Sequence, residues 1–274
     1  MHLHHNEFIG SGRSSSFEYV RFGDFSIICA SRRELVELAL DDCRNREPIS
    51  RLVFDANGHA LSLARSNPSF AHLVQDADII HADGGFLVTL SKLLGLNRIP
   101  ERSATTDMLH DFSNAFQDTS LSFFLLGSEE RVNFNCASIL KRDYPGLEIA
   151  GRRDGFFSYQ DEKLVVDEIN RSGADILWVG LGKPKEQEFC IRWRHELKPR
   201  WIITCGGCFN YVTGDYRRAP GWMQKFNLEW LHRLSTRPKE LFVRYITTTP
   251  HALWIALTEN SGSRQSDKHR SNRR

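Results

Sequence analysis

Five apolar segments of this chain are each followed at once by a short turn that is rich in glycine or carries a polar side chain. These turns begin at Asp55, His81, Gly127, Gly180 and Cys205. If the apolar segments are parallel strands, all five turns lie along one edge of a sheet, where ligands of α/β proteins bind. Glycine lets a ligand approach the backbone, and a following helix offers free N–H groups to a phosphate. The pattern predicts a ligand-binding edge but does not specify a reaction.

Asp83 is the carboxylate of these turns that could take part in catalysis. It follows the apolar segment 77–80 and precedes two glycines. A carboxylate at the exit of a strand can act as a general base and accept a proton from a sugar hydroxyl. The same carboxylate could instead cap a helix that begins near Gly85. The spacing leaves both interpretations open.

A second group of candidate residues lies in a basic and aromatic segment near the C-terminal end. Arg217 and Arg218 precede Trp222, and Trp230 and Arg233 follow. An arginine cluster at this place in an α/β chain favours an anionic ligand such as a diphosphate, because guanidinium groups pair with phosphate oxygens. Ordinary packing is the alternative role for the two tryptophans.

The elements that must position these residues alternate between short apolar segments and amphipathic segments. Strands are predicted at 25–29, 52–54, 77–80, 123–126, 147–149, 176–179 and 201–204. Helices are predicted at 57–65, 85–95, 106–116, 130–142, 160–171 and 184–196. A further helix should start at the capping box formed by Ser31 and Glu34. This alternation predicts an α/β fold with a Rossmann-like, largely parallel sheet that helices cover.

Composition divides the chain into four parts. Residues 1–16 are predicted to be a flexible N-terminus, and 17–216 an α/β domain that carries the candidate site. Residues 217–258 are predicted to form a C-terminal helical appendage of two or three helices, and 259–274 a disordered basic tail. The alternative for 217–258 is a final helical layer of the same domain.

Charge is distributed unevenly along the chain. The net charge is +2, but residues 217–274 hold 12 Lys and Arg against 4 Asp and Glu, which leaves 1–216 with a net charge of −6. The basic end predicts attraction to an anionic membrane surface or to phosphates, with a solvated tail as the alternative. Because the larger part is acidic and carries no recognised nucleic-acid-binding motif, we do not expect nucleic acid as a partner.

Missing patterns exclude several other classes of protein. No apolar run is long enough to span a membrane and no signal-peptide pattern is present, so a cytoplasmic location with reduced cysteines is expected. Cys205 and Cys208 lack a second pair of ligands, so we expect no metal site. Neither Gly-x-Gly-x-x-Gly nor a P-loop occurs, so we expect no cofactor such as NAD.

Separate short motifs follow one another in a characteristic order over roughly residues 25–245. They are Asn57; Asp83-Gly84; Glu101-Arg102; Leu126-Gly127-Ser128; Tyr144-Pro145-Gly146-Leu147; Gly180-Leu181-Gly182-Lys183-Pro184-Lys185; Gly206-Gly207-Cys208-Phe209; Arg218-Ala219-Pro220; and Leu228-Glu229-Trp230. In this order they resemble the WecG/TagA/CpsF glycosyltransferases (glycosyltransferase family 26), which build bacterial surface polysaccharides. No single motif is decisive, but their order is specific.

The resemblance implies an inverting, metal-independent transfer of a sugar from a UDP-sugar donor to a lipid-linked saccharide acceptor. Asp83 corresponds to the family's proposed general base, and Arg233 and Arg244 would stabilise the leaving diphosphate. The residues at donor-binding positions are Asn57, Arg102 and Gln187 for the sugar, and Asn210 near the uracil. The strand-end glycines that would hold the diphosphate are Gly127, Gly182 and Gly206.

The chain departs from the family pattern near the expected donor sugar. Asp55 stands where the family usually has Thr, which would turn an anionic group toward the sugar, and Asn210 replaces the usual Asp. Thr105 replaces a Gly. Gln187 and Glu186 compete for the position of the family's Gln, which we assign to Gln187. These departures affect the identity of the donor sugar more than the reaction.

The resulting hypothesis is a peripheral enzyme at the inner face of the cytoplasmic membrane. It would transfer a hexose or N-acetylhexosamine, such as N-acetylmannosamine or glucose, to an undecaprenyl-diphosphate-linked saccharide in exopolysaccharide biosynthesis. Formation of a homo-oligomer is compatible with this hypothesis. The alternatives from other classes are a non-catalytic, nucleotide-sugar-binding regulator and a nucleic-acid-binding protein.

Overall fold

The computed structural model describes residues 17–45, 50–225, 229–236 and 238–259, without the side chains of 224–230, 233, 236 and 238–247. Its centre is a six-stranded sheet in which every pair of neighbours is parallel. The strand order is β4 (Ile79–Ala82), β3 (Arg51–Ala56), β8 (Trp201–Thr204), β7 (Ile176–Gly180), β5 (Ser122–Gly127) and β6 (Glu148–Arg153). The predicted α/β, Rossmann-like parallel sheet is therefore confirmed.

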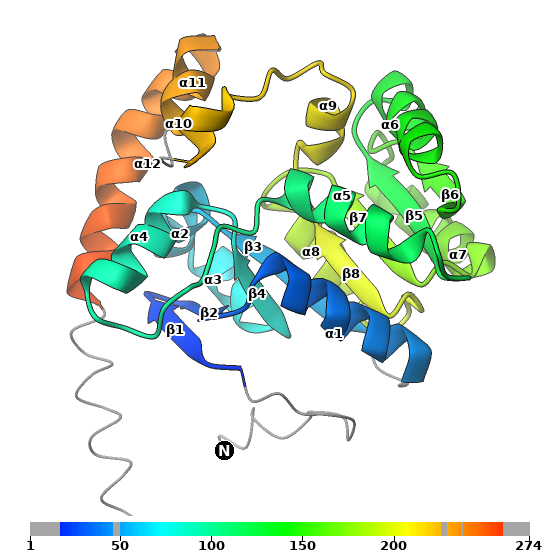
Figure 1. The fold of residues 1–274 in the computed structure, drawn as a ribbon, viewed down its shortest axis with the longest axis horizontal. Helices are drawn as coiled ribbons and strands as arrows, with labels where there is room; N and C mark the ends of the chain where they lie inside the picture. The colour runs from blue at the N-terminus through cyan, green and yellow to red at the C-terminus, as the bar shows by residue number, and fades with distance from the viewer. Residues whose placement is uncertain (1–16, 46–49, 226–228, 237, 260–274) are drawn as a thin grey trace, which may run out of the picture.

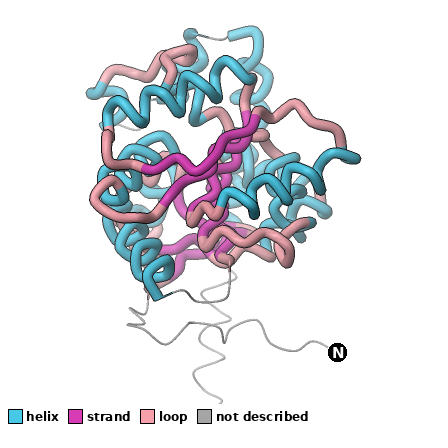
Figure 2. Tube along the Cα trace, turned by 90° about the vertical axis from the view of Figure 1, so that its right-hand side faces the viewer, coloured by secondary structure: helices cyan, strands magenta, loops and turns pink. Residues whose placement is uncertain are grey.

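Helices cover both faces of this sheet, and Figure 2 shows the strands between them. On one face Trp178 and Trp201 pack with α1 (Arg32–Asn45), α5 (Thr105–Phe116) and α6 (Glu130–Asp143). On the other face Leu177 and Ile202 pack with α7 (Glu162–Ser172) and α8 (Lys185–Arg192). Because neighbouring residues of a strand point to opposite faces and both faces are covered, the inner strands are continuous apolar runs.

Local side-chain contacts set the start of several helices. The Ser31 hydroxyl donates to Glu34 Oε2 over 2.6 Å and the Ser31 N–H donates to the same oxygen over 2.7 Å, which confirms the predicted capping box at α1. Asn57 caps α2 (Gly58–Ser66), because its Oδ1 accepts the N–H of Ala60 over 3.1 Å. This cap places Asn57 at the carboxyl end of β3.

Some predicted elements need correction. The segment predicted as a strand at 25–29 forms β2 (Phe25–Ile28), which pairs antiparallel with β1 (Tyr19–Phe22) outside the six-stranded sheet. The prediction missed β1, α3 (Pro68–Gln75) and α9 (Cys208–Val212). The predicted helix 85–95 is α4 (Gly85–Leu93), and the start of 160–171 is the short 3-10 helix η1 (Tyr159–Asp161). Short elements carry too little periodic pattern to be found reliably.

The segment after 216 holds α10 (Gly221–Lys225), α11 (Glu229–Thr236) and α12 (Pro238–Thr258), gathered on one side of the molecule in Figure 1. Ala252 and Ala256 of α12 are buried in an apolar cluster with residues of α2 and α4. Nδ1 of His251 lies 2.9 Å from Oγ of Ser62 in α2. The last turns of α12 therefore pack as a layer on the main fold, while the division of the chain into four parts stays a prediction. None of the helices in the described part of the chain has the length and apolar character needed to cross a bilayer.

Candidate active site

A cavity of about 410 Å³ opens where β3, β4, β7 and β8 end. Its walls come from the turns that follow these strands and from the segment after α9. The residues that line it include Asp55, Asn57, Asp83, Arg102, Gly182, Lys183, Glu186, Gly206, Arg217 and Arg218. The parallel sheet thus brings together most of the residues predicted from sequence, as expected for turns that share one edge.

Asp83 lies half-buried in this cavity and is held by a neighbouring amide. Nδ2 of Asn57 donates to Oδ2 of Asp83 over 3.3 Å and to Oδ2 of Asp55 over 2.9 Å. The helix that follows Asp83 has Gly84, and not Asp83, at its N-cap position. The carboxylate of Asp83 lines the cavity, where a general base could act, and its role stays a prediction.

Asn57 has a different geometry from that expected of a donor-binding amide. Its Oδ1 accepts a backbone N–H and its Nδ2 reaches two carboxylates, so the described contacts use both ends of the side chain. The structure places Asn57 in the cavity as predicted. Its contacts with Asp55 and Asp83 give it a part in ordering the carboxylates.

Asp55 carries an ion pair inside the cavity. Nζ of Lys183 lies 2.6 Å from both carboxylate oxygens of Asp55, and the two side chains are 9% and 4% exposed. Burial lowers the pKa of Lys183, but the charges of Asp55 and Glu186 outweigh this effect and the pKa is raised overall. The anionic group expected to face the sugar is thus paired with a buried cation.

Glu186, and not Gln187, lines the cavity. Both side chains are buried, and Nε2 of Gln187 donates to Oε1 of Glu186 over 3.2 Å. Neighbouring residues of a helix point about 100° apart, and here the side chain of Glu186 is the one that borders the cavity. The preference for Gln187 over Glu186 at this position needs correction, and burial raises the pKa of the Glu186 carboxyl.

Gly182 and Gly206 line the cavity as predicted, and both have positive φ angles of 77° and 51°. Their N–H groups each donate to Oε2 of Glu186 over 3.0 Å. The carboxylate of Glu186 therefore accepts hydrogen bonds from the backbone N–H groups of Gly182 and Gly206, which were expected to bind a diphosphate. In this arrangement Glu186 joins the turn after β7 to the turn after β8.

Gly127 lines neither of the two cavities described here. Its φ of 130° disfavours other residues, and a Cβ at this position would overlap the carbonyl group of Gly180 on the neighbouring strand. Close packing of β5 against β7 accounts for this glycine. The approach of Gly127 to a ligand stays a prediction.

Arg102 and Arg218 form a cationic wall of the cavity, and together with Arg32, which does not line it, they lie near Asp107 in the first turn of α5. Nη1 of Arg218 lies 2.6 Å from Oδ1 of Asp107, while Arg32 and Arg102 lie 3.3 and 4.0 Å from its Oδ2. One carboxylate thus gathers guanidinium groups from three distant parts of the chain. Such a wall suits a ligand with more than one negative charge.

Arg233 and Arg244 lie in α11 and α12, but their side chains are outside the described residues. Their expected role at the leaving diphosphate stays a prediction. Arg217 and Arg218 belong to the arginine cluster noted in the sequence and line the cavity. Glu186 was weighed against Gln187 in the sequence, whereas Lys183 was quoted in a motif without a site role, because its partner Asp55 lies on a distant strand.

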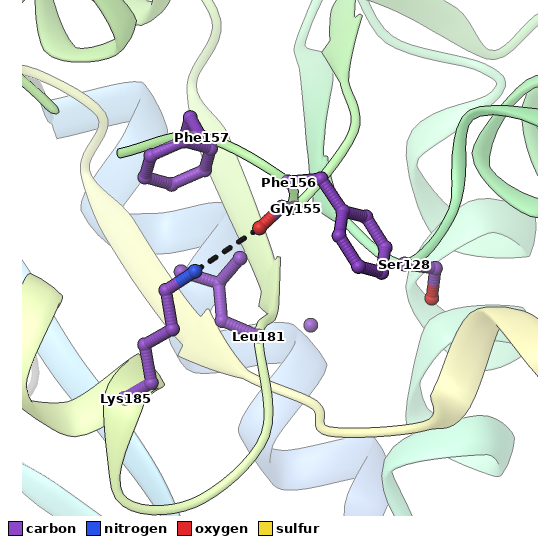
Figure 3. A pocket seen from close by; sticks show the side chains of 7 residues that line it. Ser128, Gly155, Phe156, Phe157, Leu181 and Lys185 are labelled. Carbon is purple, nitrogen blue, oxygen red and sulfur yellow. Dashed lines mark hydrogen bonds between the residues drawn. The ribbon is translucent and has the colours of Figure 1, made fainter. Parts of the chain in front are cut away.

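A second cavity, of about 520 Å³, lies farther along the same edge of the sheet, where β5, β6 and β7 end (Figure 3). It is lined by Ser128, Gly155, Phe156, Phe157, Gly180, Leu181 and Lys185. The turn after β7 borders both cavities, since Gly180 and Leu181 line this one and Gly182 lines the first. A long ligand could therefore extend across that turn from one cavity to the other.

The second cavity presents an aromatic surface. Phe156 is 77% exposed, and Figure 3 shows its ring on the side of Ser128. Ser128 has a φ of 57°, which is uncommon for a residue with a side chain, and its hydroxyl donates to Oδ1 of Asn210 over 3.3 Å. The predicted residue Asn210 is therefore next to this aromatic cavity and is absent from the lining of the first one.

Comparisons with known proteins agree on one family. The family model described as "Glycosyl transferase WecG/TagA/CpsF family" matches residues 20–266. An N-acetylglucosaminyldiphosphoundecaprenol N-acetyl-beta-D-mannosaminyltransferase from Bacillus spizizenii is 33% identical over 64% of this chain and 67% of its own length. A protein of the same description from Bacillus subtilis is 28% identical over 78% of this chain and 82% of its own.

Among solved structures, a nicotinate phosphoribosyltransferase from Vibrio cholerae aligns with a TM-score of 0.19 and 15% identity, over 69% of this chain and 49% of its own. This likeness is too weak to support an argument. Within the described residues, no three His, Cys, Asp or Glu side chains are grouped as metal ligands. The metal independence of the reaction stays a prediction.

Proposed function

The chain belongs to the WecG/TagA/CpsF family of glycosyltransferases, and on this premise we propose that it transfers a hexose or N-acetylhexosamine from a UDP-sugar to an undecaprenyl-diphosphate-linked saccharide. The observation that carries the proposal is one cavity that holds both a half-buried carboxylate, Asp83, and the arginines Arg102, Arg217 and Arg218. Transfer from a nucleotide sugar needs a base for the acceptor and positive charge for the leaving group. The two Bacillus relatives are named for transfer to a diphosphoundecaprenol-linked sugar.

The proposed mechanism is a single displacement with inversion. Asp83 accepts the proton of the acceptor hydroxyl while that oxygen forms a bond to the anomeric carbon of the donor. The bond between this carbon and the diphosphate oxygen breaks, and UDP leaves with the electron pair. Arginine side chains stabilise the growing negative charge on the diphosphate without a metal ion, because guanidinium groups donate two parallel hydrogen bonds to phosphate oxygens.

We place the nucleoside of the donor in the second cavity. The exposed ring of Phe156 offers a flat apolar surface on which a uracil can stack, and Asn210 with Ser128 offers hydrogen-bonding groups beside it. The diphosphate would then cross the turn after β7, and the sugar would reach Asp83. This order of subsites agrees with the border that the two cavities share.

The acceptor places the enzyme at the cytoplasmic surface of a membrane in this proposal. Exposed apolar side chains on α10 to α12 could contact that surface; they are Trp222, Leu231, Leu253, Trp254 and Leu257. Tryptophan is favoured at the boundary between lipid and water. The predicted basic tail at 259–274 would add attraction to anionic lipids, and its residues 260–274 lie outside the described part of the chain.

The test is UDP release by the purified protein with a panel of UDP-sugars, a diphosphoundecaprenol-linked saccharide and EDTA. Acceptor-dependent release with one donor would support the transferase and identify its sugar. UDP binding with no release for any donor would favour a regulator without turnover. Neither binding nor release would contradict the proposal.

A further inference from the structure

Four side chains form a continuous chain of contacts from the interior of the cavity to Asp83. Lys183 contacts both oxygens of Asp55 at 2.6 Å, and Asp55 accepts a hydrogen bond of 2.9 Å from Asn57. The same Nδ2 of Asn57 donates to Asp83 over 3.3 Å. These contacts connect the ends of β3 and β4 with the turn after β7. A substitution of Lys183 can therefore alter the position of the Asp83 carboxylate through the side chains of Asp55 and Asn57.

The cavity also concentrates negative charge near Asp83. Asp55, Asp83 and Glu186 all line it, and Asp55 and Glu186 are 4% and 0% exposed. Carboxylates that share a poorly solvated site resist ionisation, because each negative charge disfavours the next. A carboxylate that must accept a proton during catalysis has to be ionised beforehand. The cavity therefore needs a cation close to these carboxylates.

The charged and titratable groups around Asp83 come from every neighbouring element. Asp55 comes from β3, His59 from α2, His81 from β4, Arg102 from the segment before α5, Lys183 from the turn after β7, and Glu186 from the first turn of α8. Arg217 and Arg218 add positive charge from the segment after α9. Burial lowers the pKa of His81, so this imidazole supplies no cation at neutral pH.

Among the cations, Lys183 is placed to offset the carboxylates. Its side chain is 9% exposed, so solvent screens it little, and its Nζ lies 3.7 Å from Oε1 of Glu186. Arg102 and Arg218 are drawn toward Asp107. Although burial lowers the pKa of Lys183, the charges of Asp55, Glu186 and Asp83 raise it overall, so Lys183 and Asp83 interact.

We propose that Lys183 is a positioning residue for the transfer reaction: through Asp55 and Asn57 it orients the Asp83 carboxylate, and its positive charge offsets the negative charge of the neighbouring carboxylates. The proposal rests on the proposed function, in which Asp83 is the base. It also gives Asp55 a role other than contact with the donor sugar. Asp55 and Lys183 act as one unit, because removing either takes away the shortest ion-pair contact of the other, which stays buried.

The test compares Lys183→Met, Asp55→Asn and the double variant, with Lys183→Arg as the conservative control. The carboxyl carbons of aspartate are followed by NMR from pH 3 to pH 9 in isotope-labelled protein, and the Asp83 signal is assigned with Asp83→Asn. We expect Lys183→Met to raise the titration midpoint of Asp83 by about 1 pH unit or more, since a nearby cation shifts a carboxyl by about 1–3 units. The double variant should return the midpoint toward the wild-type value, and Lys183→Arg should keep it there.

An unchanged Asp83 midpoint in folded Lys183→Met protein would overturn the proposal. If this variant does not fold, Asp55→Asn tests the same interaction in the opposite direction. It removes the negative charge of Asp55 and keeps the positive charge of Lys183, so the Asp83 midpoint should fall below the wild-type value, and an unchanged midpoint would again overturn the proposal. Circular dichroism and a thermal melt establish the folded state of each variant.

Transfer kinetics separate this inference from the proposed function. In an active enzyme, the acidic limb of kcat should move to higher pH in Lys183→Met and return in the double variant, with a smaller effect on the KM for the donor. If wild-type protein transfers no sugar from any donor while the Asp83 titration behaves as expected, the proposed function fails and the account of Lys183 stands. If wild-type protein transfers sugar but the Asp83 midpoint does not change in the variants, the proposed function stands and the account of Lys183 fails.

Discussion

The two cavities at the carboxyl edge of the sheet are built in opposite ways. In the first, the side chains of Asp55, Lys183 and Glu186 are almost completely buried, and Lys183 contacts both carboxylates. In the second, Phe156 is 77% exposed and the amine of Lys185 is tied to the carbonyl oxygen of Gly155 over 3.1 Å. One cavity holds charges in fixed positions, and the other presents an aromatic surface with little charge.

This difference fits the two ends of a nucleotide sugar. Charge develops at the reacting end, where groups that are already oriented stabilise the transition state better than groups that must reorganise. A planar base needs a flat apolar surface and few fixed contacts. The four predictions below test this division, from the largest expected effect to the smallest.

Replacing Asp83 tests the charged cavity most directly. We expect Asp83→Asn to lower kcat by about 10²–10⁴-fold, because the amide cannot accept the proton of the acceptor hydroxyl. UDP binding, measured by calorimetry, should change little. Asp118→Asn is the matched control, since Asp118 is exposed on the turn before β5, away from both cavities. Full activity in Asp83→Asn would remove Asp83 from the role of base.

The packing role of Gly127 predicts a loss of stability and not of binding. In Gly127→Ala the new methyl group overlaps the carbonyl of Gly180, and an alanine is strained at this backbone conformation. We therefore expect a loss of roughly 2–4 kcal/mol in the free energy of unfolding. Urea denaturation measures it. Gly221→Ala is the control, because a Cβ there meets open space. Normal stability with weakened UDP binding would instead favour a ligand contact at Gly127.

The arginine wall predicts a loss in the affinity of the charged cavity for the diphosphate. Arg218→Ala should lower kcat/KM by about ten- to a hundredfold, because a hydrogen bond to a charged group contributes about 1.5–3 kcal/mol. Steady-state UDP release measures it. Arg142→Ala provides the comparison, since Arg142 is 71% exposed and pairs with Asp143 at the far end of α6. Equal kinetics in the two variants would place Arg218 outside the site.

The aromatic cavity predicts the smallest effect. Phe156→Ala should raise the KM for the UDP-sugar by about two- to tenfold and leave kcat nearly unchanged, because stacking on an aromatic ring contributes about 0.5–1.5 kcal/mol. Phe134→Ala controls for loss of an exposed ring, since Phe134 is 52% exposed on α6 and lines neither cavity. A fall in kcat without a change in KM would assign Phe156 a role at the reacting end.

Much of the fold could be predicted from local patterns. The apolar runs that precede Asp55, His81, Gly127, Gly180 and Cys205 are strands of one parallel sheet, as expected, because residues buried on both faces must all be apolar. The Ser31 and Glu34 capping box depends on neighbours three residues apart, so it was also visible. The early strand was misplaced because a short apolar run does not show which strand it pairs with.

The sequence determined that this chain is a glycosyltransferase of the WecG/TagA/CpsF family with a carboxylate at a strand exit, because motif order and hydrophobic period are properties of the chain itself. Tertiary structure alone decided which charges meet. Lys183 and Asp55 are 128 residues apart and pair only because β3 and β7 lie on either side of β8. Glu186, and not Gln187, lines the cavity because of the way α8 packs against the sheet. The need for glycine at position 127 depends on the strand that lies beside β5. Contacts between distant segments follow from how the elements pack, and local spacing carries no record of them.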